Sequence, residues 1–248
     1  MSITTVIITK NSDSTLEKCI RSAGQVSEEI IIVDSGSTDN TITIAEKYFC
    51  KIIRTKWLGY GPTKNLGHYA ASNLYILSLD SDEELSSALI NEINFRKENL
   101  QGYYFMKRLN RFGNSWIKHG AWYPDKKIRL FPKQTMWNSS PSHEQLILDA
   151  SQPVSNLKFD LLHYAYKNVE DLKNKTYLYA QLGAAGKSHY SVFKGLLKMI
   201  VSPIFGFIRS YFIKLGVLEG LNGLIISYYN ALGTFLKYKY LLKNKNAG

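Results

Sequence analysis

Short apolar runs rich in β-branched residues alternate with helical patterns through the first 80 residues of the chain. Such runs are typical of strands, and apolar residues that recur every three or four positions predict the helices between them. Strand, helix and strand in this order indicate βαβ units and a mostly parallel sheet. We expect strands at 3–9, 29–34, 51–55 and 74–80 and helices at 15–23, 38–49 and 62–71.

The size and composition of the chain are those of an ordinary globular protein. Its 248 residues suffice for one large α/β domain or two small ones. With 45% hydrophobic and 21% charged residues, a disordered, collagen-like or disulfide-framed chain is excluded. The two cysteines, Cys19 and Cys50, indicate a reducing compartment, and the first residues lack the pattern of a secretory signal. We therefore expect a cytoplasmic protein.

The net charge of +11 is concentrated near the C-terminus. From Lys187 onward there are nine cations and one carboxylate, Glu219, which leaves eight of the eleven excess charges in this segment. Such an asymmetry predicts an anionic partner, either nucleic acid or a membrane surface. The lysines are interleaved with apolar residues instead of forming a solvated arm, so we expect anionic lipid and no nucleic acid.

Two uncharged stretches, 199–208 and 220–236, lie in this basic segment. The second has 17 residues, at the lower limit of the roughly 17 to 25 that a spanning helix needs, and it contains four polar side chains. We therefore expect helices that lie in the membrane interface with their lysines toward lipid phosphates. The alternative is a pair of helices packed on the α/β domain.

Polar residues follow the predicted parallel strands at the point where each strand ends. The carboxyl ends of such strands meet at one edge of the sheet, so residues 9–11, 34–37 and 80–82 are expected to converge on one crevice. Asp80 and Asp82 are two positions apart on a strand end and face the same way. One or two carboxylates together with substrate phosphates suit Mg²⁺, although acidic residues also commonly end strands as loop residues.

Four motifs occur in a specific order: ITTVIITKN (3–11), IVDSGSTD (32–39), GPTKNLG (61–67) and LDSD (79–82). Together they resemble the nucleotide-sugar half of the inverting family 2 glycosyltransferases, which have the GT-A fold. Further segments, at 108–125, 128–131 and 142–144, are similar to the subgroup that contains the lipopolysaccharide inner-core β-1,4-glucosyltransferases. In one departure from the family pattern, Ser12 stands where an acidic residue is common.

The resemblance implies an α/β GT-A fold with three consecutive regions. Residues 1–101 would form the nucleotide-sugar half, 102–186 the acceptor-side half, and 187–248 basic, apolar, membrane-associating helices. The donor would be a UDP-sugar, and the cofactor Mg²⁺ or Mn²⁺. The residues expected to contact the donor are Thr9, Asn11, Asp34, Lys64, Asp80 and Ser81, and those expected to hold the metal are Asp80, Asp82 and His163. As alternatives, Asp34 would shape a turn, Lys64 would be a solvated lysine, and His163 would be a core residue.

Glu144 is the expected general base, because family members carry an acidic residue at this distance beyond the Asp-x-Asp motif. The alternative is an exposed glutamate at the start of a helix. Arg129 lies on a predicted strand, where an isolated charge is unfavourable. We expect it to pair with Asp125 or Glu144, or to bind a phosphate of the acceptor. The aromatic surface expected to bind the acceptor includes His119 and Trp122, although such clusters are often core.

The expected function is transfer of a hexose, with glucose favoured, from a UDP-sugar to an envelope glycolipid or lipid-linked glycan such as lipopolysaccharide core. The enzyme would be peripheral on the inner face of the cell membrane. A polyprenyl-phosphate sugar transferase of the same fold is the alternative enzyme. A basic nucleic-acid-binding protein is the alternative from another class.

Overall fold

The computed structural model describes residues 1–139, 144–184 and 192–245. The chain divides into two compact units, Met1–Arg108 with Asp125–Tyr164 (unit 1) and Leu109–Pro124 with Ala165–Gly248 (unit 2). These units are not consecutive in sequence, unlike the three expected regions, because strands β6 (Tyr103–Phe112) and β9 (Val154–Tyr166) each begin in unit 1 and end in unit 2.

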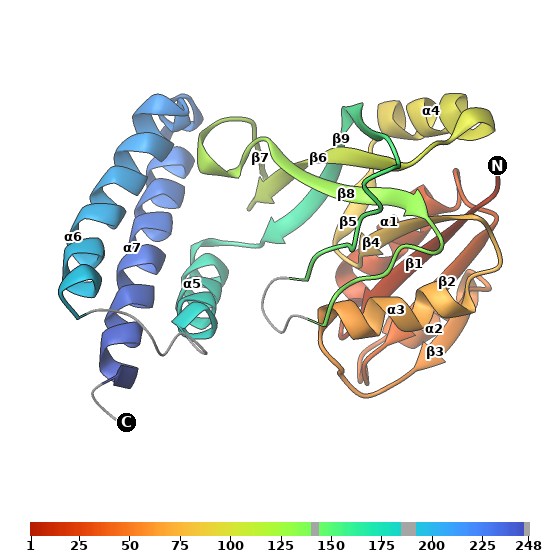
Figure 1. The fold of residues 1–248 in the computed structure, drawn as a ribbon, viewed down its shortest axis with the longest axis horizontal. Coiled ribbons are helices and arrows are strands. Elements are labelled where there is room, and N and C mark those ends of the chain that lie inside the picture. The colour runs from red at the N-terminus through yellow and green to blue at the C-terminus, as the bar shows by residue number, and fades with distance from the viewer. Residues whose placement is uncertain (140–143, 185–191, 246–248) are drawn as a thin grey trace. The chain divides into compact units, whose positions relative to one another are not determined.

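Unit 1 contains the expected parallel strands, β1 (Ile3–Thr9), β2 (Glu29–Asp34), β3 (Lys51–Arg54) and β4 (Tyr75–Asp80). They pair in the order β3-β2-β1-β4, all parallel (Figure 1). In the register, Thr9 lies opposite Asp34 and Ile8 opposite Asp80, so the polar ends of three strands lie at one edge. The βαβ prediction is confirmed.

Four helices cover this sheet: α1 (Asp13–Ala23), α2 (Thr41–Lys47), α3 (Tyr60–Ala70) and α4 (Ser87–Arg96). Alternate strand residues point to opposite faces. Ile3 and Ile7 join a core cluster with α1 and α4, whereas Val6 and Ile8 join a second cluster with the apolar residues of α3. The strands are therefore buried on both faces, which explains their continuous apolar sequences.

The second half of the sheet is antiparallel. Beyond β4 follow β8 (Asp125–Pro132), β6, β9 and β5 (Glu83–Leu85), while β7 (Ser115–Ile117) pairs with β6, giving nine strands among the described residues. Single helical turns are found at η1 (Lys97–Asn99) and η2 (Gly120–Trp122). Strand β8 lies beside β4, because Leu130 pairs with Leu77 and Phe131 with Ile76. This pairing joins the two halves of the sheet.

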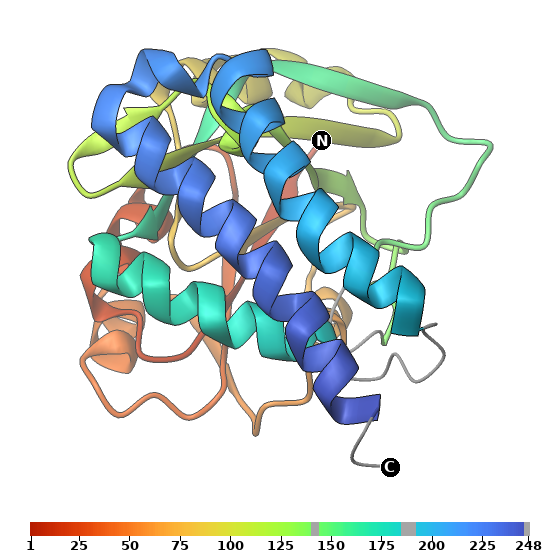
Figure 2. The same ribbon diagram turned by 90° about the vertical axis from the view of Figure 1, so that its left-hand side faces the viewer.

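Unit 2 is mainly helical, with α5 (Val169–Ala184), α6 (Val192–Ile208) and α7 (Gly220–Lys245). Figure 2 shows α6 and α7 side by side as an antiparallel hairpin, with α5 crossing α7. The hairpin turn contains η3 (Arg209–Ile213) and η4 (Gly216–Glu219). Hydrogen bonds from Gly120 N to Lys214 O (2.8 Å) and from Lys118 N to the Glu219 carboxylate (2.9 Å) fasten this turn to the β7–η2 segment.

One face of α6 is apolar and unburied. Its residues with more than about two-fifths of their area exposed recur in pairs every four positions: Leu196, Leu197, Ile200, Val201, Ile204, Phe205 and Ile208. Among the described residues, one helical stretch, Gly195–Ile213, has the length (19 residues) and apolar composition to cross a membrane, which by itself is weak evidence for a span. We call this surface, together with the exposed Leu221, Leu224 and Tyr228 of α7, the apolar face.

The contact of α3 with the sheet depends on Gly67. A Cβ atom at this position would meet Val6 Cγ1 at 2.3 Å and Val33 Cγ2 at 3.1 Å. Gly67→Ala should therefore lower the free energy of unfolding by about 1–3 kcal/mol, as overpacked cores do. Urea unfolding followed by circular dichroism measures this. Gly206→Ala is the matched control, because no atom lies within 4 Å of its Cβ position, and it should be neutral or stabilising by up to about 1 kcal/mol.

Candidate active site

The loop after β2 is organised by the carboxylate of Asp34. Oδ2 accepts hydrogen bonds from the backbone N–H groups of Gly36 and Ser37 (both 3.0 Å), and Oδ1 accepts from the hydroxyls of Thr9 (3.1 Å) and Ser37. Burial alone would raise the pKa of Asp34, but these hydrogen bonds, with Ser37 foremost, lower it below its ordinary value. The contacts are those of the turn-shaping alternative, and a contact to uracil or ribose stays a prediction.

The ends of β1, β2 and β4 adjoin one another as expected. The Asn11 side chain accepts from Thr38 N (2.8 Å), and Asn11 N donates to Ser37 Oγ (2.9 Å). The hydroxyls of Ser12 and Ser81 are 2.8 Å apart, which links the β1 end to the β4 end. Ser12, the departure from the family pattern, therefore contacts the turn between Asp80, which ends β4, and Asp82. A hollow of about 300 Å³ lies beside the Asp34 loop.

Asp80 lies between two buried cations. Lys64 Nζ is 3.1 Å from Oδ1, and Arg129 Nη2 is 2.6 Å from Oδ2. The side chains of Lys64 and Arg129 are 1% and 4% exposed, so both charges depend on their carboxylate partners. Burial would raise the pKa of Asp80, but the charges of Arg129 and Lys64 hold it well below its ordinary range. The solvated-lysine alternative for Lys64 is wrong.

The expected partners of Arg129 were Asp125 and Glu144, and this prediction is wrong. Arg129 pairs with Asp80 and with Glu83 (Nη2–Oε1, 2.6 Å). The reason is the antiparallel pairing of β8 with β4, which places Arg129 beside the end of β4. Arg129 also lines the cavity, and its role toward a phosphate of the acceptor stays a prediction.

Two residues that sequence reasoning missed, Glu83 and Arg108, complete this cluster together with Asp125. Glu83 has no exposed side-chain area and also pairs with Arg108 (3.3 Å). Arg108 Nε donates to Asp125 (2.9 Å). Burial would lower the pKa of Arg108, but the Glu83 and Asp125 charges raise it. The sequence contained one signal for this cluster. Glu83 directly follows Asp82 on a short strand, and a carboxylate buried there needs a cation as its partner.

Lys64 connects Asp80 to the predicted base, because its Nζ also lies 3.3 Å from Glu144 Oε1. The side chain of Glu144 is 24% exposed and lies in an irregular segment, not at an exposed helix start. Helix α3 holds this segment through Asn65, whose side chain donates to Trp137 O and accepts from Trp137 N, both at 2.9 Å. The ring of Trp137 lies under Lys64, 4.6 Å from Nζ. His143, the neighbouring motif residue, lies outside the described residues.

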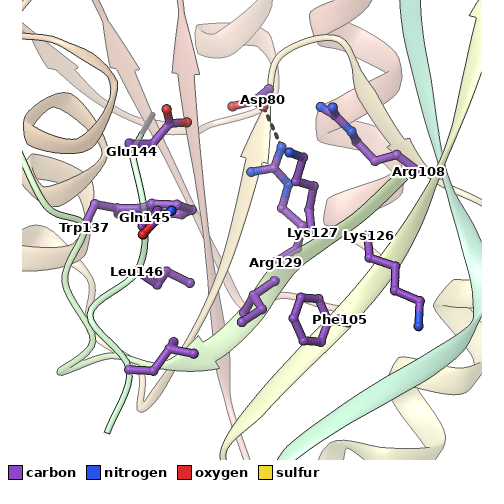
Figure 3. Close-up of a pocket in the computed structure, with 12 residues that line it drawn as sticks. Asp80, Phe105, Arg108, Lys126, Lys127, Arg129, Trp137, Glu144, Gln145 and Leu146 are labelled. Atoms are coloured by element: carbon purple, nitrogen blue, oxygen red, sulfur yellow. Dashed lines mark hydrogen bonds and ion pairs between the residues drawn. The ribbon is translucent and has the colours of Figure 1, made fainter. Parts of the chain in front are cut away.

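A cavity of about 650 Å³ contains both Asp80 and Glu144. Figure 3 shows Glu144, Gln145 and Leu146 on one side and Arg108, Lys126, Lys127 and Arg129 on the other, with Asp80 at the strand end above them. Phe105, Ile128, Trp137 and Leu148 supply apolar lining. The cavity therefore combines apolar surface with several charged groups, which is typical of a ligand site.

Asp82 and His163 are the remaining predicted metal ligands. Asp82 Oδ2 lies 3.4 Å from His163 Nε2, close to the spacing of about 3 Å that neighbouring ligands have around a metal with bonds of about 2.0–2.1 Å. Within the described residues, no group of three or more His, Cys, Asp or Glu side chains is arranged to hold a metal. Mg²⁺ needs only one or two carboxylates when substrate phosphates complete its shell, so Asp80 and Asp82 fit such an ion.

His119 and Trp122, the predicted acceptor residues, belong to unit 2. His119 Nδ1 is 2.7 Å from Glu219, and Trp122 stacks on Tyr166 with ring centroids 4.7 Å apart. Trp122 Nε1 also donates to Asn230 (3.4 Å). Both side chains thus have partners inside their own unit, and their role toward an acceptor stays a prediction.

In open α/β sheets ligands bind beyond the carboxyl ends of the parallel strands, and the polar strand ends and the charged cavity of this chain lie in that region. Comparison with known proteins identifies the family. The family model for glycosyl transferase family 2 matches residues 4–144, and the chain belongs to this family. The expected α/β fold class is confirmed by the structure.

Two curated relatives extend along nearly the whole chain. An uncharacterized glycosyltransferase of Rickettsia conorii is 30% identical over 98% of this chain and 92% of its own length. A lipopolysaccharide core biosynthesis glycosyltransferase, LpsC of Rhizobium meliloti, is 27% identical over 93% of this chain and 88% of its own. The crystal structure of S. aureus TarS 1-349 aligns with all of this chain and 92% of that one at 15% identity, with a TM-score of 0.48.

Asp34→Asn should destabilise the protein by about 1–3 kcal/mol at neutral pH, because the amide replaces one acceptor oxygen with a donor that faces hydroxyl or N–H groups. Since the folded pKa of Asp34 is lowered, its contribution to stability is present above the unfolded value of about 3.9 and is lost as the pH falls below it. The difference in free energy of unfolding between the wild type and the variant should therefore decrease at acidic pH. Urea unfolding at several pH values measures this.

The control is Glu46→Gln, because Glu46 is an exposed carboxylate whose ion pair with Arg54 is long, at 3.8 Å. It should change stability by less than about 0.5 kcal/mol. Equal stability of Asp34→Asn and the wild type at neutral pH would show that Asp34 does not organise the loop.

Proposed function

We propose that this chain is a metal-dependent, inverting glycosyltransferase that moves a hexose, with glucose favoured, from a UDP-sugar to an envelope glycolipid or lipid-linked glycan such as lipopolysaccharide core. The observation that carries the proposal is the position of Lys64 between Asp80 and Glu144. One buried ammonium lies 3.1 Å from the first carboxylate and 3.3 Å from the second, and both carboxylates line the same cavity.

Inversion requires a base on the side of the sugar opposite the leaving group. In the proposed reaction, Glu144 accepts the proton of the acceptor hydroxyl while the hydroxyl oxygen forms a bond to C1 of the sugar. The bond from C1 to the diphosphate oxygen breaks, and UDP leaves with the electron pair. Lys64 faces both carboxylates, so it holds Glu144 at a fixed place relative to Asp80.

The donor side of the site has the residues for a metal-bound diphosphate. Asp80 and Asp82, with His163 beside Asp82, would hold the divalent cation, which as a Lewis acid would neutralise charge that builds on the departing UDP. Thr9, Asn11, Asp34, Lys64 and Ser81 are the proposed donor contacts. The Asp34 loop would present its shape to the nucleoside, because its own carboxylate oxygens are engaged within the loop.

The proposed acceptor class is supported by the name of the Rhizobium meliloti relative, which assigns that protein to lipopolysaccharide core biosynthesis. A polyprenyl phosphate is the alternative acceptor, and a transfer assay with both acceptor types distinguishes them. If the proposed acceptor is correct, product should form with core glycolipid and not with the polyprenyl phosphate.

Glu144→Gln tests the base. The change preserves shape and removes the proton acceptor, so turnover should fall by about 10² to 10⁴-fold while UDP-sugar affinity changes by less than a few-fold. Radiolabelled sugar transfer measures turnover, and calorimetry measures affinity. Glu98→Gln, at an exposed carboxylate in η1, is the control and should retain wild-type turnover. A Glu144→Gln enzyme that keeps more than roughly a tenth of its turnover would place the base elsewhere, with Asp125 as the next candidate.

We also propose that unit 2 binds anionic membrane through the apolar face. The face runs along α6 with Lys198 between Leu197 and Ile200, and Lys237, Lys239 and Lys243 lie toward the C-terminal end of α7. Apolar burial and attraction to lipid phosphates together give stable interfacial binding. A groove of about 320 Å³ between α6 and α7, lined by Pro203, Ile204 and Phe235 among others, belongs to the same surface.

The double variant Ile200→Gln, Ile204→Gln should reduce binding to phosphatidylglycerol vesicles by at least about tenfold, because burying one isoleucine contributes about 1.5–3 kcal/mol. Flotation of the protein with vesicles measures the bound fraction. Phe95→Gln, at an 89% exposed position of α4, is the matched control and should bind as the wild type does. If the wild-type protein stays unbound at physiological salt, the membrane proposal is wrong and the apolar face is better explained as an interface with another protein.

A further inference from the structure

The buried carboxylate of Glu83 has no part in the reaction proposed above. We propose that Glu83 is a positioning residue that sets the affinity of the site for a divalent cation with UDP, by sharing Arg129 with Asp80 and so keeping Asp80 available to the cation. This inference rests on the proposed donor and metal.

Glu83 contacts both Asp80 and Arg129, one of the two cations that hold Asp80. Its Oε1 lies 2.6 Å from Arg129 Nη2 and 3.3 Å from Arg108 Nη1, and its Oε2 accepts a hydrogen bond from the backbone N–H of Asp80 (3.0 Å). Arg129 reaches Asp80 with the same Nη2 atom, also at 2.6 Å. One guanidinium nitrogen therefore contacts two carboxylates, and removing the Glu83 charge would leave Asp80 as the carboxylate partner of that nitrogen.

The backbone of Glu83 also fixes the other metal ligands. Glu83 pairs with His163 across strands β5 and β9, and Tyr164 N donates to Asp82 O (2.9 Å). This pairing brings the Asp82 carboxylate within reach of His163. A change of the Glu83 side chain alone leaves these backbone contacts in place, which separates its electrostatic role from its place in the strand.

The charges of the cluster indicate what Glu83 does. Glu83 places a buried negative charge between Arg108 and Arg129, the two guanidinium groups nearest to it. This charge offsets the repulsion that a divalent cation at Asp80 would meet from Arg129. Without the Glu83 charge, Arg129 would keep Asp80 as its carboxylate partner and oppose the cation more strongly.

Three variants test this by calorimetric titration of Mn²⁺ with UDP into the full chain. Glu83→Gln should weaken binding by about ten- to a hundredfold, because Arg129 then interacts with Asp80 alone. Arg129→Gln should bind Mn²⁺ with UDP at least as tightly as the wild type, since Asp80 loses its competing cation while Arg108 still partners Glu83. The double variant Glu83→Gln, Arg129→Gln should return to within a few-fold of the wild type.

A purely structural role for Glu83 predicts the opposite pattern, in which the double variant binds no better than Glu83→Gln. That result, or weaker binding by Arg129→Gln, would overturn the inference. Thermal unfolding confirms that each variant is folded, and if Glu83→Gln does not fold, Arg129→Gln alone decides. If the wild type binds UDP equally with Mn²⁺ and with EDTA, the proposed metal dependence fails together with the inference. A metal-dependent wild type with an unaffected Glu83→Gln refutes the role of Glu83 alone.

Discussion

The ion pairs of Arg129 are the interaction on which the charged end of the cavity depends. A guanidinium with 4% of its side chain exposed is stable only beside carboxylates, and removing one partner of a buried pair typically costs about 3–5 kcal/mol. Asp80 and Glu83 supply those carboxylates, and the Arg129 charge in turn keeps Asp80 ionised, with its pKa well below the ordinary range. The same contacts thus stabilise the fold and set the ionisation state of Asp80, a proposed metal ligand.

These contacts exist because the pairing of neighbouring strands changes from parallel to antiparallel at β4. Strand β4 is parallel to β1 but antiparallel to β8, so the carboxyl end of β4 lies beside residues that follow it by almost fifty positions. Parallel strands deliver the polar loops of Thr9, Asp34 and Asp80 to one edge, and the antiparallel strands add Arg108 and Arg129. The cavity forms where the two kinds of pairing meet.

The two proposed roles of the chain belong to separate units, each with its own core. In unit 1 the charged groups are buried and paired, which suits recognition of a phosphorylated donor. In unit 2 a small core around Ile117, Leu172 and Ile226 holds the helical hairpin, while apolar side chains of α6 stay outside it. A soluble monomer rarely exposes so continuous an apolar surface. Binding to the membrane that contains a lipid acceptor would account for this exposure.

The sequence alone determined the βαβ order and the positions at which the parallel strands end, because hydrophobic periodicity and turn residues act over a few positions. It also predicted the family from motifs in order, and the family model confirmed it. The tertiary structure decided which charges meet: Arg129 with Glu83, and Lys64 with both Asp80 and Glu144. Long-range ion pairs follow from which strands become neighbours, and the local pattern of β8 does not encode that β4 will lie beside it.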